Sequence, residues 1–419
     1  MKVLYFHQHF STPRGSGGIR SYEMARRLLA RGHRVTMVCG SYAGGQTGLE
    51  TPFVRGRRRG TVDGIDVVEF DLSYSNSDGF LRRTWTFLRY ALRSTALVFT
   101  EAYDLVFATS TPLTAGIPGI VARRLRGKPF VFEVRDLWPE LPREMGVIRN
   151  PLVLGAMSVL EWLSYHSAVR LVGLSPGIVD GIARRGIDRD RIALIPNGCD
   201  LSIFATAVEP LRPAGVAQSD TLAIFAGTHG IANGLDAVLD AAAELKRRGR
   251  GDIRLLLVGQ GRLKPALEER ARREELDNVL FHAPVEKAQL ARLLAGTDVG
   301  LQILANVPAF YFGTSPNKFF DYLAAGLPVL INYPGWLADA VRENDCGFAV
   351  PPDDPVAFAD ALERAAADRA ATRAMGARAR DLARREFDRA LLAERWVDWI
   401  EHGVAARGPS ATDAGKAAA

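Results

Sequence analysis

Cysteine is scarce in this chain of 419 residues, and long apolar runs are missing. The three cysteines, Cys39, Cys199 and Cys346, lie far apart without a Cys-x-x-Cys pair, so the sequence predicts neither a disulfide framework nor a zinc site. The seven histidines also lack metal-ligand spacing. No window approaches the ~18 uncharged apolar residues of a membrane span. We therefore expect a metal-free protein of the reducing cytoplasm.

Neither sign of charge dominates the whole chain, which carries 53 Lys and Arg against 47 Asp and Glu. The halves differ: residues 1–205 hold 27 basic and 18 acidic side chains, and the remainder holds 26 and 29. A basic first half predicts attraction to polyanions, either anionic lipid headgroups or nucleic acid. Because no zinc-finger spacing, RNP pattern or basic heptad helix accompanies it, we expect a membrane surface and no nucleic acid.

The composition itself, 47% hydrophobic and 24% charged residues, is typical of a globular protein. At ~100–200 residues per domain, the length predicts two domains with a cleft between them. In the first half, short apolar runs alternate with helical patterns such as residues 18–31. The predicted strands are residues 3–7, 35–38, 65–70, 105–108, 130–134, 171–174 and 192–195. Continuous apolar strands separated by helices predict a parallel sheet covered on both faces.

A Pro- and Ala-rich stretch at residues 204–216 interrupts this alternation, and a second series follows. Its predicted strands are residues 222–226, 253–258, 279–281, 299–303, 329–331 and 348–350. Helical signals at 357–386 and 390–402 close the pattern. We therefore expect an α/β protein of two doubly wound domains in tandem, with ligands at the carboxyl ends of the strands. The predicted divisions are an N-terminal domain at 1–204, a linker at 205–220, a C-terminal domain at 221–386, a helix at 387–404 that returns to the N-terminal domain, and a disordered tail at 405–419.

Glycine-rich loops follow three of the predicted strands. They contain Gly15, Gly17 and Gly18 in the first domain, and Gly227, Thr228, His229, Gly230, Gly259, Gly261 and Arg262 in the second. Such loops let a backbone approach an anionic ligand, and they also suit plain tight turns. Lys264 stands where a dinucleotide fingerprint would have its third glycine, so the second-domain loops favour a phosphate-bearing ligand over NAD.

The segment at residues 311–330 predicts a phosphate site most strongly. Ser315 is a suitable N-cap and Pro316 suits the first helical position, so a helix is expected to begin here before Asn317. Lys318 then places a cation at the positive end of that helix, which is unfavourable unless an anion binds there. A bound diphosphate would resolve the conflict, although a lysine that reaches out to water is an alternative.

Several segments together resemble family 4 retaining glycosyltransferases of the GT-B fold, with two Rossmann-like domains. They are the Leu-x-x-Gly-His-x-Val-Thr pattern at 29–36, the Pro-Asn-Gly segment at 195–204 and the Ala-Ala-Gly-x-Pro-Val segment at 320–329. The match covers about residues 1–400. The Arg-Asp-Leu-Trp-Pro-Glu run at 135–140 with Ser-Pro-Asn-Lys at 315–318 is similar to the branch with bacterial N-acetyl-fucosamine transferases of surface-polysaccharide assembly.

The resemblance implies a nucleotide-diphosphate sugar, expected to be UDP-linked, on the second domain, an acceptor on the first, and transfer with retention. No metal or cofactor is expected. Asp321 matches the second acid of the family's Glu-x7-Glu motif and is expected to hydrogen-bond the ribose, whereas the first acid falls on Gly313. His229 and its neighbours occupy a loop in which relatives often carry Arg and Lys, so Lys318, helped by Arg262, would have to supply the diphosphate charge.

The catalytic step is less visible in the sequence. Glu133 and Asp136 end a first-domain strand, and we predict that Asp136 orients or deprotonates the acceptor hydroxyl, although it could simply cap a turn. His7 and His9 also follow a strand, but no pattern distinguishes them from loop residues.

Residues 80–93 are helical, basic and aromatic. Arg82, Arg89 and Arg93 share one side, and another side carries an apolar row of Leu81, Trp85, Leu88 and Leu92. This is the pattern of a helix in a membrane interface, and packing against the sheet is the alternative. We therefore expect a peripheral glycosyltransferase acting on a glycan or lipid-linked acceptor at the inner face of the cytoplasmic membrane. A GT-B-type nucleotide-sugar epimerase and a non-enzymatic sugar-nucleotide binder are the alternatives.

Overall fold

The computed structural model describes residues 1–15, 18–42, 45–74 and 78–405, and its contacts divide the chain into two compact units. Unit 1 comprises Met1–Pro196 together with the chain from Leu392 onward, and unit 2 comprises Asn197–Leu391. Residues 197–204, expected in the N-terminal domain, therefore group with unit 2. The expected linker groups with unit 2 as well, because the Leu211 N–H bonds to the carbonyl of Arg292. Residues 406–419 of the predicted tail lie outside the described residues.

Unit 1 is built on a sheet of eight strands in the order β3-β4-β2-β1-β5-β6-β7-β8. The strands are β1 (Lys2–Phe6), β2 (Arg34–Gly40), β3 (Arg57–Val62), β4 (Ile65–Phe70), β5 (Leu105–Thr109), β6 (Phe130–Val134), β7 (Arg170–Gly173) and β8 (Ile192–Leu194). Every residue of β5 and β6 is buried, as their unbroken apolar runs predict. One expectation is corrected, because β3 pairs antiparallel with β4 and makes the sheet mixed. Its alternating Arg-rich sequence suits an edge strand with one exposed face.

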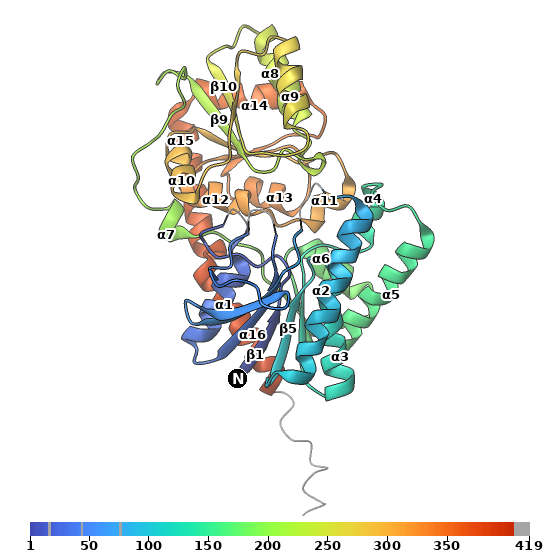
Figure 1. The fold of residues 1–419 in the computed structure, drawn as a ribbon. Helices are drawn as coiled ribbons and strands as arrows, with labels where there is room; N and C mark the ends of the chain where they lie inside the picture. Colours follow the sequence, from blue (N-terminus) through green and yellow to red (C-terminus); the bar gives the residue numbers. More distant parts are fainter. Residues whose placement is uncertain (16–17, 43–44, 75–77, 406–419) are drawn as a thin grey trace, which may run out of the picture. The chain divides into compact units, whose positions relative to one another are not determined.

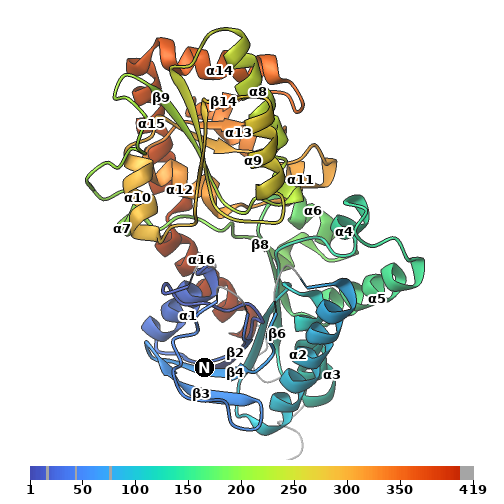
Figure 2. The same cartoon turned by 45° about the horizontal axis from the view of Figure 1, so that its top comes forward.

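Helices cover both faces of this sheet, with α1 and α16 on one face and α2, α3 and α5 on the other (Figures 1 and 2). The helical elements are α1 (Arg20–Ala30), α2 (Phe80–Thr100), η1 (Leu113–Gly116), α3 (Ile117–Arg126), α4 (Glu140–Glu144), α5 (Pro151–Ser167), α6 (Pro176–Ala183), η2 (Arg189–Arg191) and α16 (Arg389–Ala405). The last helix packs in the core of unit 1, where Trp396 is fully buried against Tyr5 and Phe107. No described helix is both long and apolar enough to cross a bilayer.

Unit 2 is built on six parallel strands in the order β11-β10-β9-β12-β13-β14. They are β9 (Thr221–Ala226), β10 (Ile253–Val258), β11 (Val279–His282), β12 (Val299–Gln302), β13 (Val329–Ile331) and β14 (Gly347–Ala349). Its helical elements are α7 (Leu201–Phe204), η3 (Ile231–Asn233), α8 (Asp236–Arg247), α9 (Lys264–Arg273), α10 (Lys287–Ala295), α11 (Pro308–Gly313), α12 (Asn317–Ala325), α13 (Trp336–Glu343), α14 (Pro355–Ala367), α15 (Arg369–Leu382) and η4 (Ala383–Phe387).

One predicted helix of unit 2 is divided. Residues 357–386 were expected to form a single helix, but α14 ends at Ala367 and α15 begins at Arg369. Asp368 lies between them, and its side chain accepts a hydrogen bond from the Ala371 N–H, so it caps the second helix. Apolar side chains of α8 and α14 pack against β9 and β10 in the core of unit 2.

Candidate active site

Two glycine loops lie against each other at the carboxyl ends of β9 and β10 in unit 2. The His229 N–H donates to the carbonyl of Gln260 at 3.0 Å, and the Leu263 N–H donates to the carbonyl of His229 at 3.0 Å. A Cβ on Gly259 would come within 1.9 Å of the Gly227 oxygen, and one on Gly261 within 2.4 Å of the His229 oxygen. These two glycines are therefore required for the close approach of the loops, whether or not a ligand binds.

His229 is enclosed between these loops. Its ring is fully buried, and neither ring nitrogen has a hydrogen-bond partner among the described residues. Burial, helped by the charge of Lys264, lowers its pKa to about 4, so the imidazole is neutral near pH 7. Lys264 itself donates to the carbonyls of Gly259 and His282, which explains why a lysine occupies that position.

Lys318 reaches the first of these loops from α12. Its Nζ donates to Oδ1 of Asn233 at 2.7 Å, lies 4.4 Å from the ring centroid of Phe225, and would be 3.6 Å from a Cβ on Gly227. Burial lowers its pKa to about 7, and no carboxylate of the described residues opposes that effect. The structure thus places a mostly buried cation without a counter-charge beside a glycine loop.

The start of α12 differs from the prediction. The helix begins at Asn317 with Pro316 as its N-cap residue, and no side chain caps it. The Ser315 hydroxyl instead accepts a hydrogen bond from the Asn197 N–H at 3.1 Å, and the Asn197 amide donates to the Ser315 carbonyl. The Pro-Asn-Gly segment therefore holds the residues before α12, and the first N–H groups of the helix have no side-chain cap.

Asp321 lies one turn after Asn317, and its Oδ1 has no hydrogen-bond partner among the described residues. Burial raises its pKa to about 7, although Lys287 and Arg389 oppose the rise. Both of these cations already bind Asp200, at 3.0 and 2.6 Å. Asp321 therefore remains able to accept a hydrogen bond from a hydroxyl of a ligand.

The other predicted donor residues of unit 2 lie around these groups. The Thr228 carbonyl accepts from the Asn233 side chain at 2.7 Å, which connects the first glycine loop to the partner of Lys318. Gly230 precedes η3, where an added Cβ would lie 3.6 Å from Cγ2 of Thr228, and Arg262 is exposed before α9.

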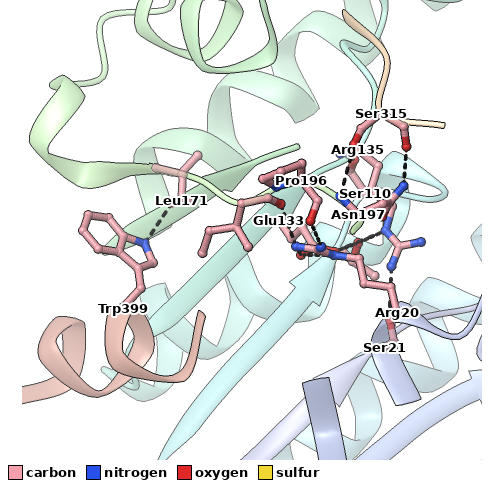
Figure 3. A network of polar contacts seen from close by, with 12 residues as sticks. Arg20, Ser21, Ser110, Glu133, Arg135, Leu171, Pro196, Asn197, Ser315 and Trp399 are labelled. Atoms are coloured by element: carbon pink, nitrogen blue, oxygen red, sulfur yellow. Dashed lines mark hydrogen bonds and ion pairs between the residues drawn. The ribbon is translucent and has the colours of Figure 1, made fainter. Parts of the chain in front are cut away.

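Unit 1 contains a buried network of charges at the carboxyl end of β6 (Figure 3). One oxygen of Glu133 accepts from Nε and Nη2 of Arg20 at 3.0 and 2.9 Å, and the other accepts from the Thr109 hydroxyl at 2.9 Å and Nε of Arg135 at 3.2 Å. Burial would raise the pKa of Glu133, but the two guanidinium groups outweigh it and hold the pKa below its ordinary value. Glu133, predicted as catalytic, thus has both oxygens occupied.

The other site residues predicted in the first domain are Asp136 and the glycines of the first loop. Asp136 follows Arg135, and burial raises the pKa of its carboxyl group while Arg135 opposes the rise. Gly15 donates to the carbonyl of Thr12 in a turn, and Gly18 is exposed just before α1. Gly17 lies outside the described residues.

A group of five side chains in unit 1 has buried polar atoms; sequence reasoning named His7 and His9 among them without assigning them a role, and it overlooked the other three. They follow the adjacent strands β1, β5 and β6, and each has a polar atom without a hydrogen-bond partner among the described residues: His7, Gln8, His9, Thr111 and Trp138. Burial lowers the pKa of His9 to about 4, and that of His7 well below its ordinary value. Tyr42, Tyr74 and Phe87 surround the ring of His9.

Arg20 was overlooked as well, although a signal was present. Like Lys318, it is a cation in the first turn of a helix after a glycine loop, where the macrodipole disfavours positive charge. No cluster of metal-ligating side chains occurs in the part of the chain that the structure describes.

The apolar row of α2 points outward from unit 1. Leu81, Trp85, Leu88 and Leu92 are 81, 60, 41 and 69% exposed, and Phe99 continues the row. Tyr90, Leu97 and Val98 form the face of α2 that packs on the sheet. The apolar row predicted from the sequence is therefore a different face of the helix, and packing against the sheet does not explain it. The predicted basic side is partly occupied, because Arg93 donates to the carbonyl of Gly56.

These two α/β units define the GT-B class of glycosyltransferase folds. Residues 16–198 match the family model described as a glycosyl transferase 4-like domain, and residues 220–368 match the model described as glycosyl transferases group 1. Together these stretches span most of the chain. The chain belongs to the family 4 type of glycosyltransferases.

A curated relative and two solved structures illustrate this similarity. A D-inositol 3-phosphate glycosyltransferase of Xylanimonas cellulosilytica is 34% identical over 214 residues, which are 46% of this chain and 48% of the relative. Sucrose-phosphate synthase from Thermosynechococcus elongatus superposes with a TM-score of 0.75 at 19% identity, over 97% of this chain and 99% of that one. Anabaena HepE in complex with UDP-glucose gives 0.68 at 16% identity, over 96 and 100%.

The chain spans about half the length of the curated relatives it matches. The structural similarities are at low identity and concern the fold. The predicted relation to N-acetyl-fucosamine transferases stays a prediction.

Proposed function

We propose that this chain is a retaining glycosyltransferase that transfers a sugar from a nucleotide diphosphate sugar to a glycan or lipid-linked acceptor. The nucleotide of the proposed donor is UDP. The observation that carries the proposal is Lys318, a mostly buried ammonium without a counter-charge beside the loop at Gly227. Such a cation is costly unless an anion binds beside it. Anabaena HepE, which shares the fold, binds UDP and UDP-glucose, and this supports a UDP-linked donor.

On this proposal, the diphosphate lies between Lys318, the uncapped N–H groups of α12 and the loop from Gly227 to Gly230. Asp321, with its unpaired Oδ1, accepts hydrogen bonds from the ribose. As the glycosidic bond breaks, negative charge grows on the leaving diphosphate, and Lys318 stabilises it there. This electrostatic stabilisation needs no metal ion.

The acceptor hydroxyl is assigned to the carboxyl ends of β1, β5 and β6. An unpaired buried polar group costs about 1–3 kcal/mol, so the neutral groups of His7, Gln8 and His9 favour a ligand with several hydroxyls. Asp136, whose pKa is raised by burial, is the candidate that orients or deprotonates the acceptor. Glu133 has no free oxygen, and its proposed task is to hold Arg20 and Arg135 in position.

The outward row of α2 is proposed to contact an anionic membrane surface. The row presents Trp85 and four other apolar side chains to solvent, and Arg82 at its edge is 68% exposed. Large exposed apolar rows beside basic residues are typical of helices that lie in a membrane interface. The charge excess of residues 1–205 supports the same assignment.

Two experiments test the transfer proposal. A thermal-shift screen over UDP, GDP, ADP and TDP sugars is expected to show selective stabilisation by a UDP sugar, because a ligand that binds the native state raises the melting temperature. Incubation with that labelled donor alone should then give only slow hydrolysis. Conversion of the donor into another nucleotide sugar would indicate an epimerase, and stabilisation by none of the four would contradict the proposal.

A further inference from the structure

A cavity of about 460 Å³ opens in unit 1 at the edge of the sheet where β7 begins. Strands β6 and β7 are parallel, so this edge is opposite the carboxyl ends that carry Glu133 and Asp136. The carboxyl ends of α3 and α5, the start of β7, η2 and α16 surround it. The lining side chains with charge or a titratable ring are Arg123, His166, Arg170, Asp190 and Arg191.

Two arginines of this cavity, Arg170 and Arg191, bring positive charge that no ion pair in the described ranges neutralises. Arg170 donates to the Asp190 carbonyl at 2.6 Å and stacks on Trp399 at 4.3 Å, and Arg191 donates to the Ala168 carbonyl at 2.6 Å. Neither forms an ion pair within the described ranges, and each guanidinium has five N–H donors, so several donors remain. The carboxyl ends of α3 and α5 attract cations, but each is equivalent to only about half a charge. An anion with several oxygens would match the remaining N–H donors and the positive charge of Arg170 and Arg191.

An apolar track leads along α5 to the same cavity. Leu152, Val159 and Trp162 lie on the outward face of this helix and are 81, 59 and 47% exposed. The next residue of that face is His166, which lines the cavity and stacks on Trp162 with ring centroids 4.1 Å apart. The one charged residue of α5 is Glu161, which is buried and pairs with Arg185, so the outward face carries no charge.

We propose that this cavity binds the phosphate group of a lipid, with Arg170 and Arg191 as its main ligands and the outward face of α5 against the acyl chains. A guanidinium fork matches the geometry of phosphate oxygens, and the uncharged row suits hydrocarbon. The helices α2, α3 and α5 form one layer over the sheet (Figure 1), so a lipid here and a membrane against α2 are compatible. The site does not depend on the transfer reaction.

Vesicle flotation with three compositions tests the proposal. Phosphatidylcholine vesicles are compared with the same vesicles containing phosphatidic acid or, at matched charge, cholesteryl hemisuccinate, which is anionic but has no phosphate. The full chain is expected to prefer the phosphatidic acid vesicles over the hemisuccinate vesicles. The pair Arg170→Gln and Arg191→Gln should lower this partition at least about tenfold, the cost of one strong charge-assisted bond or more.

Matched variants distinguish specific recognition of the phosphate from an effect of net charge and from a loss of folding. The exposed pair Arg272→Gln and Arg273→Gln on α9 changes the net charge equally and should leave the partition unchanged. The pair Arg170→Lys and Arg191→Lys keeps the charge but not the fork, and should lose the preference for phosphate over hemisuccinate while retaining general anionic binding. Equal binding to the two anionic vesicles, or an equal loss in the α9 control, would overturn the proposal.

Calorimetry distinguishes a lipid from a free phosphate. Dihexanoyl phosphatidic acid below its micelle concentration is expected to bind at least about tenfold more tightly than glycerol 3-phosphate, because burial of apolar surface adds to the phosphate contact. Trp162→Ser should remove this difference without weakening glycerol 3-phosphate. Equal affinities in the unmodified chain would refute the role of α5 and leave a site for soluble phosphate esters.

Discussion

Arg20 on α1 and Glu133 on β6 are paired with two guanidinium nitrogens within 3.0 Å of a single carboxylate oxygen. Both side chains are buried, at 2 and 0% exposure. The other N–H groups of Arg20 donate to the carbonyls of Ile195 and Pro196, the last residues of unit 1 before the chain enters unit 2. The pair therefore ties the first helix of unit 1 to its central sheet and to the end of its continuous chain.

Glu133→Gln should destabilise unit 1. It leaves the buried guanidinium of Arg20 and the half-buried one of Arg135 without a counter-charge, and breaking a buried pair in this way costs about 3–5 kcal/mol in free energy of unfolding. Urea denaturation followed by tryptophan fluorescence measures the change. Because the folded pKa of Glu133 lies below its ordinary value, its contribution is present above that value and is lost as the pH falls through the lowered pKa. Glu50→Gln at an exposed ion pair is the control, and equal stability of the two variants would contradict this assignment.

Lys318→Met should weaken UDP binding without unfolding the protein. The substitution keeps the length of the side chain and removes a charge-assisted hydrogen bond to the diphosphate, which corresponds to about 1.5–3 kcal/mol in binding free energy. Because Lys318 is desolvated without a counter-charge, the ligand-free variant should be no less stable than the parent. Titration calorimetry measures the first effect and thermal melting the second. Unchanged UDP affinity would remove Lys318 from the site, and Lys128→Met on unit 1 provides the control.

Binding of UDP near pH 8 should be accompanied by proton uptake. In the free protein the pKa of Lys318 is lowered to about 7, so this side chain is neutral in most molecules at pH 8. A neighbouring diphosphate raises the pKa again, and the side chain then takes up a proton. The affinity should therefore fall as the pH rises above 7. Calorimetry in buffers of different ionisation enthalpy measures the number of protons. The same number of protons for the unmodified chain and Lys318→Met would assign the uptake to another group.

Asp321→Asn should lose affinity for uridine as well as for UDP, because an amide offers one acceptor oxygen and no charge, whereas a carboxylate offers two charged acceptor oxygens to the ribose hydroxyls. Affinity for pyrophosphate should be retained, and an equal loss would indicate a general structural defect. The variant also tests pH dependence. Between the ordinary pKa of 3.8 and the raised value of about 7, folded Asp321 holds a proton that the unfolded chain releases. Stability of the parent therefore falls as the pH rises through this window, and the variant should show a smaller fall.

The α2 row should bind anionic vesicles at low salt. The double variant Trp85→Ser with Leu92→Ser is expected to reduce the part of vesicle binding that persists at high salt, because these side chains supply the apolar contact. Arg82→Gln with Arg89→Gln should reduce the salt-sensitive part, at about 1 kcal/mol per basic residue near the surface. Co-sedimentation over a salt series measures both. Equal partition onto neutral and anionic vesicles, or onto neither, would contradict the assignment.

The sequence predicted much of the fold because its signals are local. Unbroken apolar runs such as β5 and β6 and the stripe of α1 predicted buried strands and helices at nearly the observed residues. The local signals were insufficient where a single residue interrupts a pattern, as Asp368 does between α14 and α15. They also missed β3, because an Arg-rich edge strand has no continuous apolar run.

Of the candidate site, the sequence alone determined the residue types at the strand ends: the glycine loops, the lysine at the start of α12 and the acids after β6. Only the tertiary structure decided which of them remain available to a ligand. Glu133 and Asp136 are three residues apart, yet Glu133 is saturated by Arg20 and Arg135, and Arg20 is more than a hundred residues away in sequence. Likewise, Lys318 is distinguished because no carboxylate of the described chain opposes the lowering of its pKa by burial, and that depends on which distant segments the fold brings together. Charge balance in a buried site is a sum over neighbours in space, so no local pattern can determine it.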